Sequence, residues 1–201
     1  MTDDGASEKR AASEKHAHSE ARGADGAAQP LLVVTAGLPA TGKSTIAEVV
    51  GNRLGLPVLS VDPIEAAILS AGIDSAQPTG LAAYLVAETM AEGVLASGRG
   101  VVIDAVNAVE PAREQWVKLA ARQEATLRFI EVVCSDPEVH RERLAARAGR
   151  HAATGTAYAV EQSLDEWEPW TGESAAVARV TLDSVQPLGV NIEQALGFLG
   201  S

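Results

Sequence analysis

The eight residues from Gly37 to Ser44, GLPATGKS, constrain the fold of this chain more than any other feature. They follow an apolar stretch at 31–36, typical of a strand buried on both faces, and precede a stretch at 44–54 that is expected to be helical. Gly37 and Gly42 allow the backbone to wrap closely around an anion, so that consecutive N–H groups point inward. Lys43 and Ser44 complete the pattern of a phosphate-binding loop between a strand and a helix.

The loop also predicts the chemistry of its ligand. Lys43 supplies a point charge for the β- and γ-phosphates of ATP, and the Ser44 hydroxyl is suited to ligate Mg²⁺. The helix that follows adds the positive end of its dipole. The alternative is a glycine-rich turn without a ligand, which does not require Lys43 and Ser44 in this register. Lys43 is also an expected catalytic residue, and the expected ATP-binding residues are Gly37, Leu38, Pro39, Ala40, Thr41, Gly42, Lys43, Ser44, Thr45 and, from a later helix, Arg143.

Strand-like and helical stretches alternate along the rest of the chain. Short apolar runs predict strands at 31–36, 57–61, 101–103, 126–133 and 177–182. Helices are expected at about 44–54, 63–71, 81–97 and 111–123, over much of 137–168, and at 192–199. This alternation is typical of α/β proteins, in which helices cover both faces of a parallel sheet.

The length of 201 residues suits one compact domain. Residues 1–29 contain no leucine, isoleucine, valine or aromatic side chain, so we expect a disordered tail followed by a single domain at 30–201. The N-terminus lacks the apolar core of a secretory signal, and no apolar run is long enough to span a membrane. The single cysteine, Cys134, cannot form an internal disulfide. We therefore expect a soluble, cytoplasmic protein.

The charge balance bears on the possible partners. The formal net charge is −11, from 27 acidic and 16 basic residues. Proteins that bind nucleic acid through its phosphates usually present a basic face, so this balance argues against a nucleic-acid partner. The expected partners are ATP and a small-molecule acceptor, and the sequence leaves the oligomeric state open.

Asp62 and Asp104 follow the second and third predicted strands. In an open parallel sheet, ligands bind beyond the carboxyl ends of the strands. If the third strand neighbours the first, Asp104 lies beside the phosphate loop and is suited to hold Mg²⁺ together with Ser44, unless it is only a solvated loop acid. Asp62 then lies two strands away, at about 10 Å, where an acceptor hydroxyl would approach. We expect Asp62 to be a catalytic residue.

A structural interpretation of Asp62 also exists. The run Asp62-Pro63-Ile64-Glu65 has the pattern of a helix start, with Asp62 as the N-cap and Glu65 reaching back to it. Asn107 is a further polar candidate, for orienting a water or a phosphate. Packing in or onto the core is the expected role of Cys134 and of the tryptophans, although Trp167 and Trp170 are also able to stack on a substrate.

Four arginines cluster in ten positions: Arg141, Arg143, Arg147 and Arg150. On a helix, the last three share one face. Arginine binds phosphate oxygens with two parallel hydrogen bonds, so a helix of this kind is suited to close over a transferring phosphoryl group. We expect a lid at about 147–157, with Arg147 and Arg150 as catalytic residues. A solvated helix face paired with Glu138 and Glu142 is the alternative.

Together these features resemble the small AAA-domain P-loop kinases, a group that includes polynucleotide 5′-hydroxyl-kinase-like, zeta-toxin-like and chloramphenicol-phosphotransferase-like proteins. The resemblance covers about residues 31–199 and is carried by the phosphate loop, Asp62, Asp104-Ala105-Val106-Asn107, the arginine helix and Trp167-Glu168-Pro169. It implies a P-loop NTPase fold, a three-layer α/β sandwich whose five-stranded parallel sheet has the order 2-3-1-4-5. It also implies ATP- and Mg²⁺-dependent phosphotransfer, with Asp62 as the acceptor-side base and the arginine helix as the lid.

One departure from the family pattern concerns the acceptor. Polynucleotide kinases of this type carry an arginine three residues after the aspartate, where this chain has Glu65. An acidic side chain there would repel a nucleic-acid phosphate, so we expect phosphorylation of a hydroxyl on a small molecule. The alternatives are a polynucleotide 5′-hydroxyl kinase and, from another class, a regulatory module that binds ATP without catalysis.

Overall fold

The computed structural model describes residues 29–154 and 167–200, with the backbone alone for 148–154. Its centre is a five-stranded parallel sheet in the order β2-β3-β1-β4-β5. The strands are β1 (Leu31–Ala36), β2 (Val58–Ser60), β3 (Val101–Asp104), β4 (Thr126–Val133) and β5 (Arg179–Asp183). The predicted parallel sheet and its strand order are therefore confirmed.

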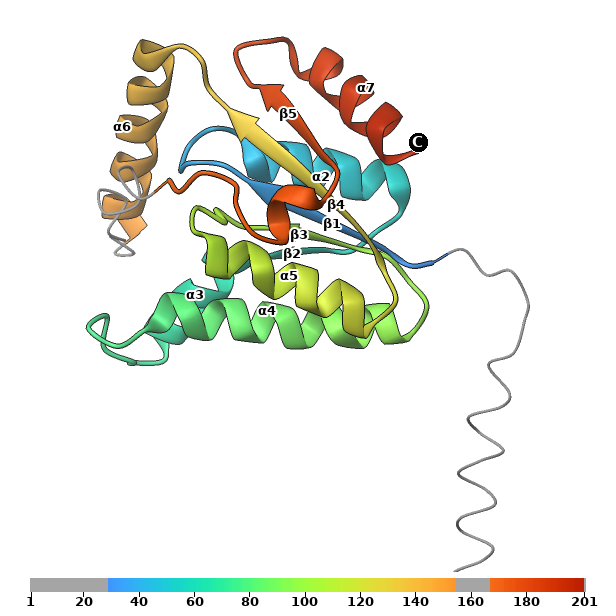
Figure 1. The fold of residues 1–201 in the computed structure, drawn as a ribbon. Coiled ribbons are helices and arrows are strands. Elements are labelled where there is room, and N and C mark those ends of the chain that lie inside the picture. Colours follow the sequence, from blue (N-terminus) through green and yellow to red (C-terminus); the bar gives the residue numbers. More distant parts are fainter. Residues whose placement is uncertain (1–28, 155–166, 201) are drawn as a thin grey trace, which may run out of the picture.

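Helices cover both faces of this sheet and complete a three-layer sandwich (Figure 1). On one face lie α2 (Lys43–Leu54) and α7 (Leu188–Leu199). On the other lie α4 (Thr79–Ala96) and α5 (Glu110–Arg122), with α3 (Val61–Ser70) packed beside α4. The helix α6 (Pro137–Thr154) stands at the edge of the sheet where the strands end, apart from both layers. No helix in the described part of the chain is long and apolar enough to cross a membrane.

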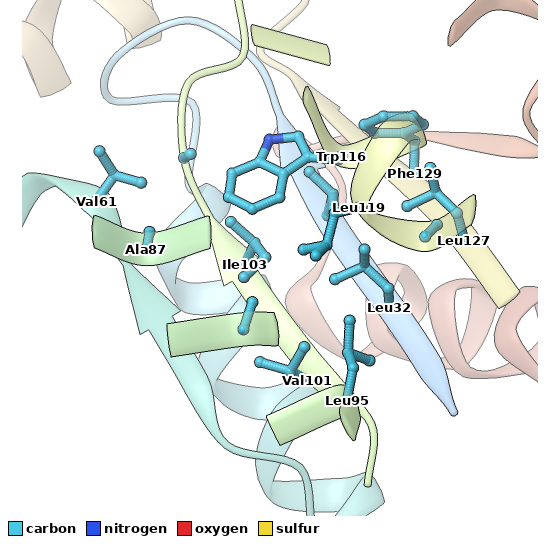
Figure 2. Close-up of a cluster of buried hydrophobic side chains, with 14 of the residues drawn as sticks. Leu32, Val61, Ala87, Leu95, Val101, Ile103, Trp116, Leu119, Leu127 and Phe129 are labelled. Carbon is cyan, nitrogen blue, oxygen red and sulfur yellow. The ribbon is translucent and has the colours of Figure 1, made fainter. Parts of the chain in front are cut away.

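Alternation along β1 distributes its side chains between two cores. Leu32 and Val34 face α4 and α5, while Val33 faces α2 and α7. The larger core includes the fully buried Trp116, which lies beside Leu119 and above Ile103 in Figure 2. Helix α4 contributes the small, fully buried side chains of Ala83, Ala87 and Ala91 to this core. Trp116 is a core residue, as its sequence context predicts.

The structure differs from the sequence predictions mainly at the ends of elements. The second strand ends at Ser60 instead of residue 61, and α3 begins directly at Val61. The last helix begins at Leu188 instead of residue 192, because Pro187 in an extended conformation precedes its first turn. Gly189 and the polar Asn191 conceal this early start in the sequence.

Candidate active site

The phosphate loop joins β1 to α2 and takes a conformation that requires glycine. Gly37 has φ of 144°, and a β-carbon there would lie 2.2 Å from the backbone oxygen of Val132. Its N–H donates to the carbonyl of Val106 at 2.9 Å. Gly42, with φ of 101°, turns the chain into α2. The positive φ values and the close approach of β4 hold the loop in a fixed curve, as the sequence pattern predicts.

Lys43 is the first residue of α2, and its side chain is buried against the loop. The ammonium group donates to the Leu38 carbonyl at 2.8 Å, an oxygen that also accepts the Thr41 hydroxyl at 2.9 Å. Burial lowers the pKa of Lys43 from 10.5 to about 8, although the charges of Asp104 and Asp62 oppose this shift and Arg147 adds to it. The loop lysine therefore lies within the electrostatic reach of three candidate residues from other elements.

Asp104 ends β3, which neighbours β1, so it lies beside the phosphate loop as predicted for this strand order. Its side chain is buried and accepts the Ser60 hydroxyl at 3.0 Å. Ser44 is exposed and lines the cavity beside the loop. A carboxylate and a hydroxyl are hard oxygen ligands of the type that Mg²⁺ prefers, since it usually completes its coordination with water and substrate phosphates. These two residues fit a magnesium site.

Asp62 is the second residue of α3 and does not cap it, so the N-cap interpretation is wrong. Ser60 occupies the N-cap position because the helix begins one residue before Asp62. Glu65 does not reach back either: its carboxylate accepts the Thr79 hydroxyl of α4 at 2.8 Å. Asp62 forms an ion pair with Arg147 of α6, 85 residues away in the sequence. This pair brings the expected base and an expected lid arginine together.

Arginines of α6 divide between the site and solvent. Arg143 and Arg147 both line the cavity beside the phosphate loop. Arg143 donates to the Ser184 hydroxyl at 2.7 Å and to its carbonyl at 3.2 Å. Arg141 is exposed and pairs with Glu138, which matches the solvated alternative. Of the predicted lid, the side chains of 148–154, Arg150 among them, and residues 155–157 lie outside what the structure describes.

The cavity beside the phosphate loop has a volume of about 410 Å³. The phosphate loop and the start of α2 line it with Ala40, Gly42, Lys43, Ser44 and Thr45, and α6 lines it with its two arginines. Sequence reasoning missed the third wall, which the start of α7 and the segment before it supply with Ser184, Gln186, Leu188 and Asn191. These residues belong to no recognisable motif, so no signal in the sequence pointed to this segment.

A smaller cavity of about 190 Å³ lies against the other residues of the loop. Leu38 and Thr41 line it, together with the end of β4, His140 of α6 and Trp167.

Trp170 packs edge-to-face on Phe129 with ring centroids 5.0 Å apart, so it packs onto the core as expected. The Arg113 guanidinium stacks on Trp167, with its Cζ atom 4.8 Å from the centroid of the Trp167 ring. Trp167 therefore packs against Arg113 and also lines the smaller cavity.

The fully buried Asn107 has a structural role, which corrects the expectation that it orients a water or phosphate. Its side chain donates to the Thr35 carbonyl at 2.7 Å and accepts the Trp116 indole N–H at 2.9 Å. Its backbone N–H donates to the Tyr84 hydroxyl at 3.0 Å. Burial raises the pKa of Tyr84 to about 12, so this hydroxyl stays protonated at neutral pH.

Residues 32–170 match the family model described as an AAA domain. The match covers more than half of the chain, so the protein belongs to this AAA-domain family, as the sequence motifs indicate. No curated protein sequence matches the chain.

Several solved structures have the same fold. A gluconokinase of Sinorhizobium meliloti is 23% identical, with a TM-score of 0.59 over 86% of this chain and 93% of its own. The APS kinase of Mycobacterium tuberculosis, in complex with AMPPNP and APS, is 18% identical, with a TM-score of 0.62 over 86% and 99%. Kti12 of Chaetomium thermophilum, in complex with ADP-AlF3, is 19% identical, with a TM-score of 0.65 over 85% and 100%. The fold is therefore that of the P-loop kinases and related NTPases.

Proposed function

We propose that this protein is an ATP- and Mg²⁺-dependent phosphotransferase that acts on a hydroxyl group of a small molecule. The observation that carries the proposal is the meeting of Asp62 and Arg147 within electrostatic reach of the loop lysine, Lys43. A carboxylate for the acceptor, an arginine for the phosphoryl group and a lysine for the nucleotide phosphates are the parts that phosphoryl transfer uses. The solved kinases of this fold support the same reaction class.

The nucleotide half of the site consists of the loop and the larger cavity. Backbone N–H groups of the loop and the start of α2 offer hydrogen bonds and a positive dipole end to the phosphates. Lys43 and Arg143 add positive charge from two sides. Ser44 and Asp104 would hold Mg²⁺, which neutralises charge on the phosphates when it is bound. The cavity wall at Gln186 and Leu188 would then face the rest of the nucleotide.

The acceptor half lies on the side of α3 and α4. Asp62 would accept the hydroxyl proton as the acceptor oxygen bonds to the γ-phosphorus and the bond to the bridging oxygen of ADP breaks. Asp62, Asp104 and Glu65 all raise the pKa of Tyr84 through their charges, so three carboxylates surround this region. Their negative potential disfavours an anionic acceptor, which supports a neutral or cationic small molecule over a nucleic acid.

Two variants test this division of roles. K43A should lose nucleotide binding, because it removes the charge beside the phosphates. D62N should bind MgATP with unchanged affinity and lose phosphoryl transfer by about 100-fold or more, because the amide cannot accept a proton. The assay follows γ-labelled ATP with a panel of neutral, cationic and anionic hydroxyl compounds and a metabolite extract, and calorimetry follows nucleotide binding.

Each outcome has a distinct meaning. The exposed ion pair of Asp62 contributes less than about 1 kcal/mol, so D62N should remain folded, and urea unfolding checks this. Normal turnover by D62N would remove Asp62 from the mechanism. Nucleotide binding with no labelled product from any acceptor would favour the non-catalytic binding module. Label on a 5′-hydroxyl oligonucleotide would overturn the small-molecule proposal.

A further inference from the structure

The residues His140, Arg143 and Arg147 follow one another on α6 at the spacing of a single helix face. Each reaches a different part of the candidate site. Arg147 pairs with Asp62 of α3, and Arg143 binds Ser184 in front of α7. His140 reaches the phosphate loop itself, where its Nε2 lies 2.8 Å from the Pro39 carbonyl oxygen. The third contact has no place in the phosphotransfer roles assigned so far.

The bond from His140 controls the orientation of one peptide group of the loop. A carbonyl oxygen accepts hydrogen bonds only, so the imidazole must carry its hydrogen on Nε2. The Pro39–Ala40 peptide is planar and trans, and its N–H points away from its C=O. Holding the Pro39 oxygen toward the His140 imidazole therefore turns the Ala40 N–H away from His140. Ala40 lines the nucleotide cavity and has a φ of 63°, which a non-glycine residue rarely adopts without support.

The first turn of α6, which carries His140, is stabilised by an N-cap. Asp136 caps the start of α6, because its carboxylate accepts the N–H groups of Glu138 at 2.9 Å and Val139 at 3.2 Å. The His140 N–H donates to the Asp136 carbonyl at 3.0 Å. The imidazole thus extends from the first turn of a capped helix that follows β4 directly. Only three residues separate the end of β4 from the start of α6.

We propose that His140 is a positioning residue of the nucleotide site, which fixes the Pro39–Ala40 peptide so that the Ala40 N–H faces the phosphates. The inference rests on the proposed function, because it assigns a role in the same phosphate site. It adds to the loop a support that the phosphate-binding pattern does not contain, since Nε2 acts from a helix 101 residues away.

Substitutions at His140 separate this role from simple packing. H140F removes the donor and keeps a ring, for which the 190 Å³ cavity beside His140 leaves room. H140Q restores an N–H donor of similar reach. E142Q, on an exposed residue of the same helix, is the matched control. Calorimetry measures the affinity of each full-length variant for MgADP, and thermal unfolding measures its stability without ligand.

We expect H140F to bind MgADP about tenfold more weakly than the wild type, with a smaller ligand-induced rise in Tm. H140Q should recover most of the affinity, and E142Q should equal the wild type. Equal MgADP affinity of H140F and the wild type would overturn the role of His140 while the proposed function stands. Equal losses in H140F and H140Q would also overturn it, because the donor would then not matter. If the wild-type protein binds no MgADP, the proposed function itself fails, and the inference fails with it.

Discussion

At the scale of single residues, the site depends on a lysine whose pKa is lowered by burial. The Lys43 ammonium is buried beside the phosphate loop, and its pKa falls to about 8. The carboxylates of Asp104 and Asp62 stabilise its charged form, but less than burial destabilises it. The same ammonium donates to Leu38, so a phosphate would have to replace this carbonyl as its partner. The surroundings of Lys43 therefore destabilise its charged form, and a bound anion would stabilise it.

This charge state predicts how nucleotide binding depends on pH. The ammonium form binds phosphate, so the affinity for MgADP should be constant below about pH 7 and fall by up to about tenfold per pH unit above pH 8. Calorimetry in two buffers of different ionisation enthalpy should show proton uptake on binding at pH 9. K43R is the control. Its guanidinium stays charged over the whole pH range, so its affinity for MgADP should not vary with pH. An affinity for the wild type that is flat to pH 9.5 would contradict the lowered pKa.

The same shift acts on stability with the opposite sign. Between pH 8 and 10.5, the unfolded chain binds more protons at Lys43 than the folded chain does. The contribution of Lys43 to the free energy of unfolding should therefore rise through this range. It is least favourable below pH 8, where the folded protein must carry a buried charge.

At the scale of elements, the candidate site is a set of loops held against one another by the ends of the strands. The phosphate loop rests on β4 through the contact of Gly37 with the Val132 oxygen. The segment at 167–170 is held against α5 by Arg113, whose guanidinium donates to the carbonyls of Ala108, Glu168 and Pro169. These contacts fix two segments that lie outside the helices and strands.

Substitution at Gly37 should disrupt the loop through its tertiary contact. In G37A the new β-carbon would lie 2.2 Å from a backbone oxygen, so β1 and β4 would have to separate. We expect a loss of about 3 kcal/mol or more in the free energy of unfolding. G55A is the matched control, because Gly55 also has a positive φ, of 66°, but open space around it, and it should lose about 1 kcal/mol. Similar losses for both in urea unfolding would contradict this account.

The hydrogen bonds of Arg113 predict that even a conservative substitution there lowers the free energy of unfolding. The buried guanidinium donates to four carbonyl groups, and the ammonium of R113K has neither the donors nor the planar shape to replace it. We expect R113K to lose about 2 kcal/mol or more in urea unfolding, because buried carbonyls would lose their partners. Arg122 lies half-exposed in an ion pair with Glu88, so R122K should lose less than about 0.5 kcal/mol. An equally mild effect of R113K would show that Arg113 is not required to hold the segment.

At the scale of the whole molecule, charge restricts the partners that the site can attract. The formal net charge of −11 repels polyanions at a distance. The carboxylates whose charges act on Tyr84 add negative charge on the side of the site where we propose that the acceptor binds. The arginines of α6 that face the site have local partners in Ser184 and Asp62. The larger cavity, of about 410 Å³, is lined by Lys43, Arg143 and Arg147, so positive charge gathers there although the chain as a whole is acidic.

The charge predicts the outcome of an oligonucleotide titration. A 5′-hydroxyl oligonucleotide labelled with a fluorophore should show no change in anisotropy at micromolar protein, even at about 50 mM salt, where phosphate contacts are strongest. A small basic nucleic-acid-binding protein serves as the positive control. Binding that weakens steeply with salt would instead indicate a basic groove and favour the polynucleotide kinase.

The sequence by itself determined the local parts of this protein. The phosphate loop is readable because glycines at fixed positions, a lysine and a hydroxyl are properties of neighbouring residues. The alternation of strands and helices is equally local, and it predicted the parallel sheet, while the family resemblance supplied the strand order. Both were confirmed, and the errors fell on the ends of elements such as β2 and α7.

Only the tertiary structure decided which distant side chains meet. Asp62 has one local pattern for a strand-end acid and another for an N-cap, and its pairing with Arg147 depends on the position of α6 at the edge where the strands end. Ser184, His140 and Arg113 carry no motif, because their roles depend on contacts with backbone groups far along the chain. Local sequence sets the backbone preferences of each element, whereas these contacts arise from packing between elements, which neighbouring residues do not encode.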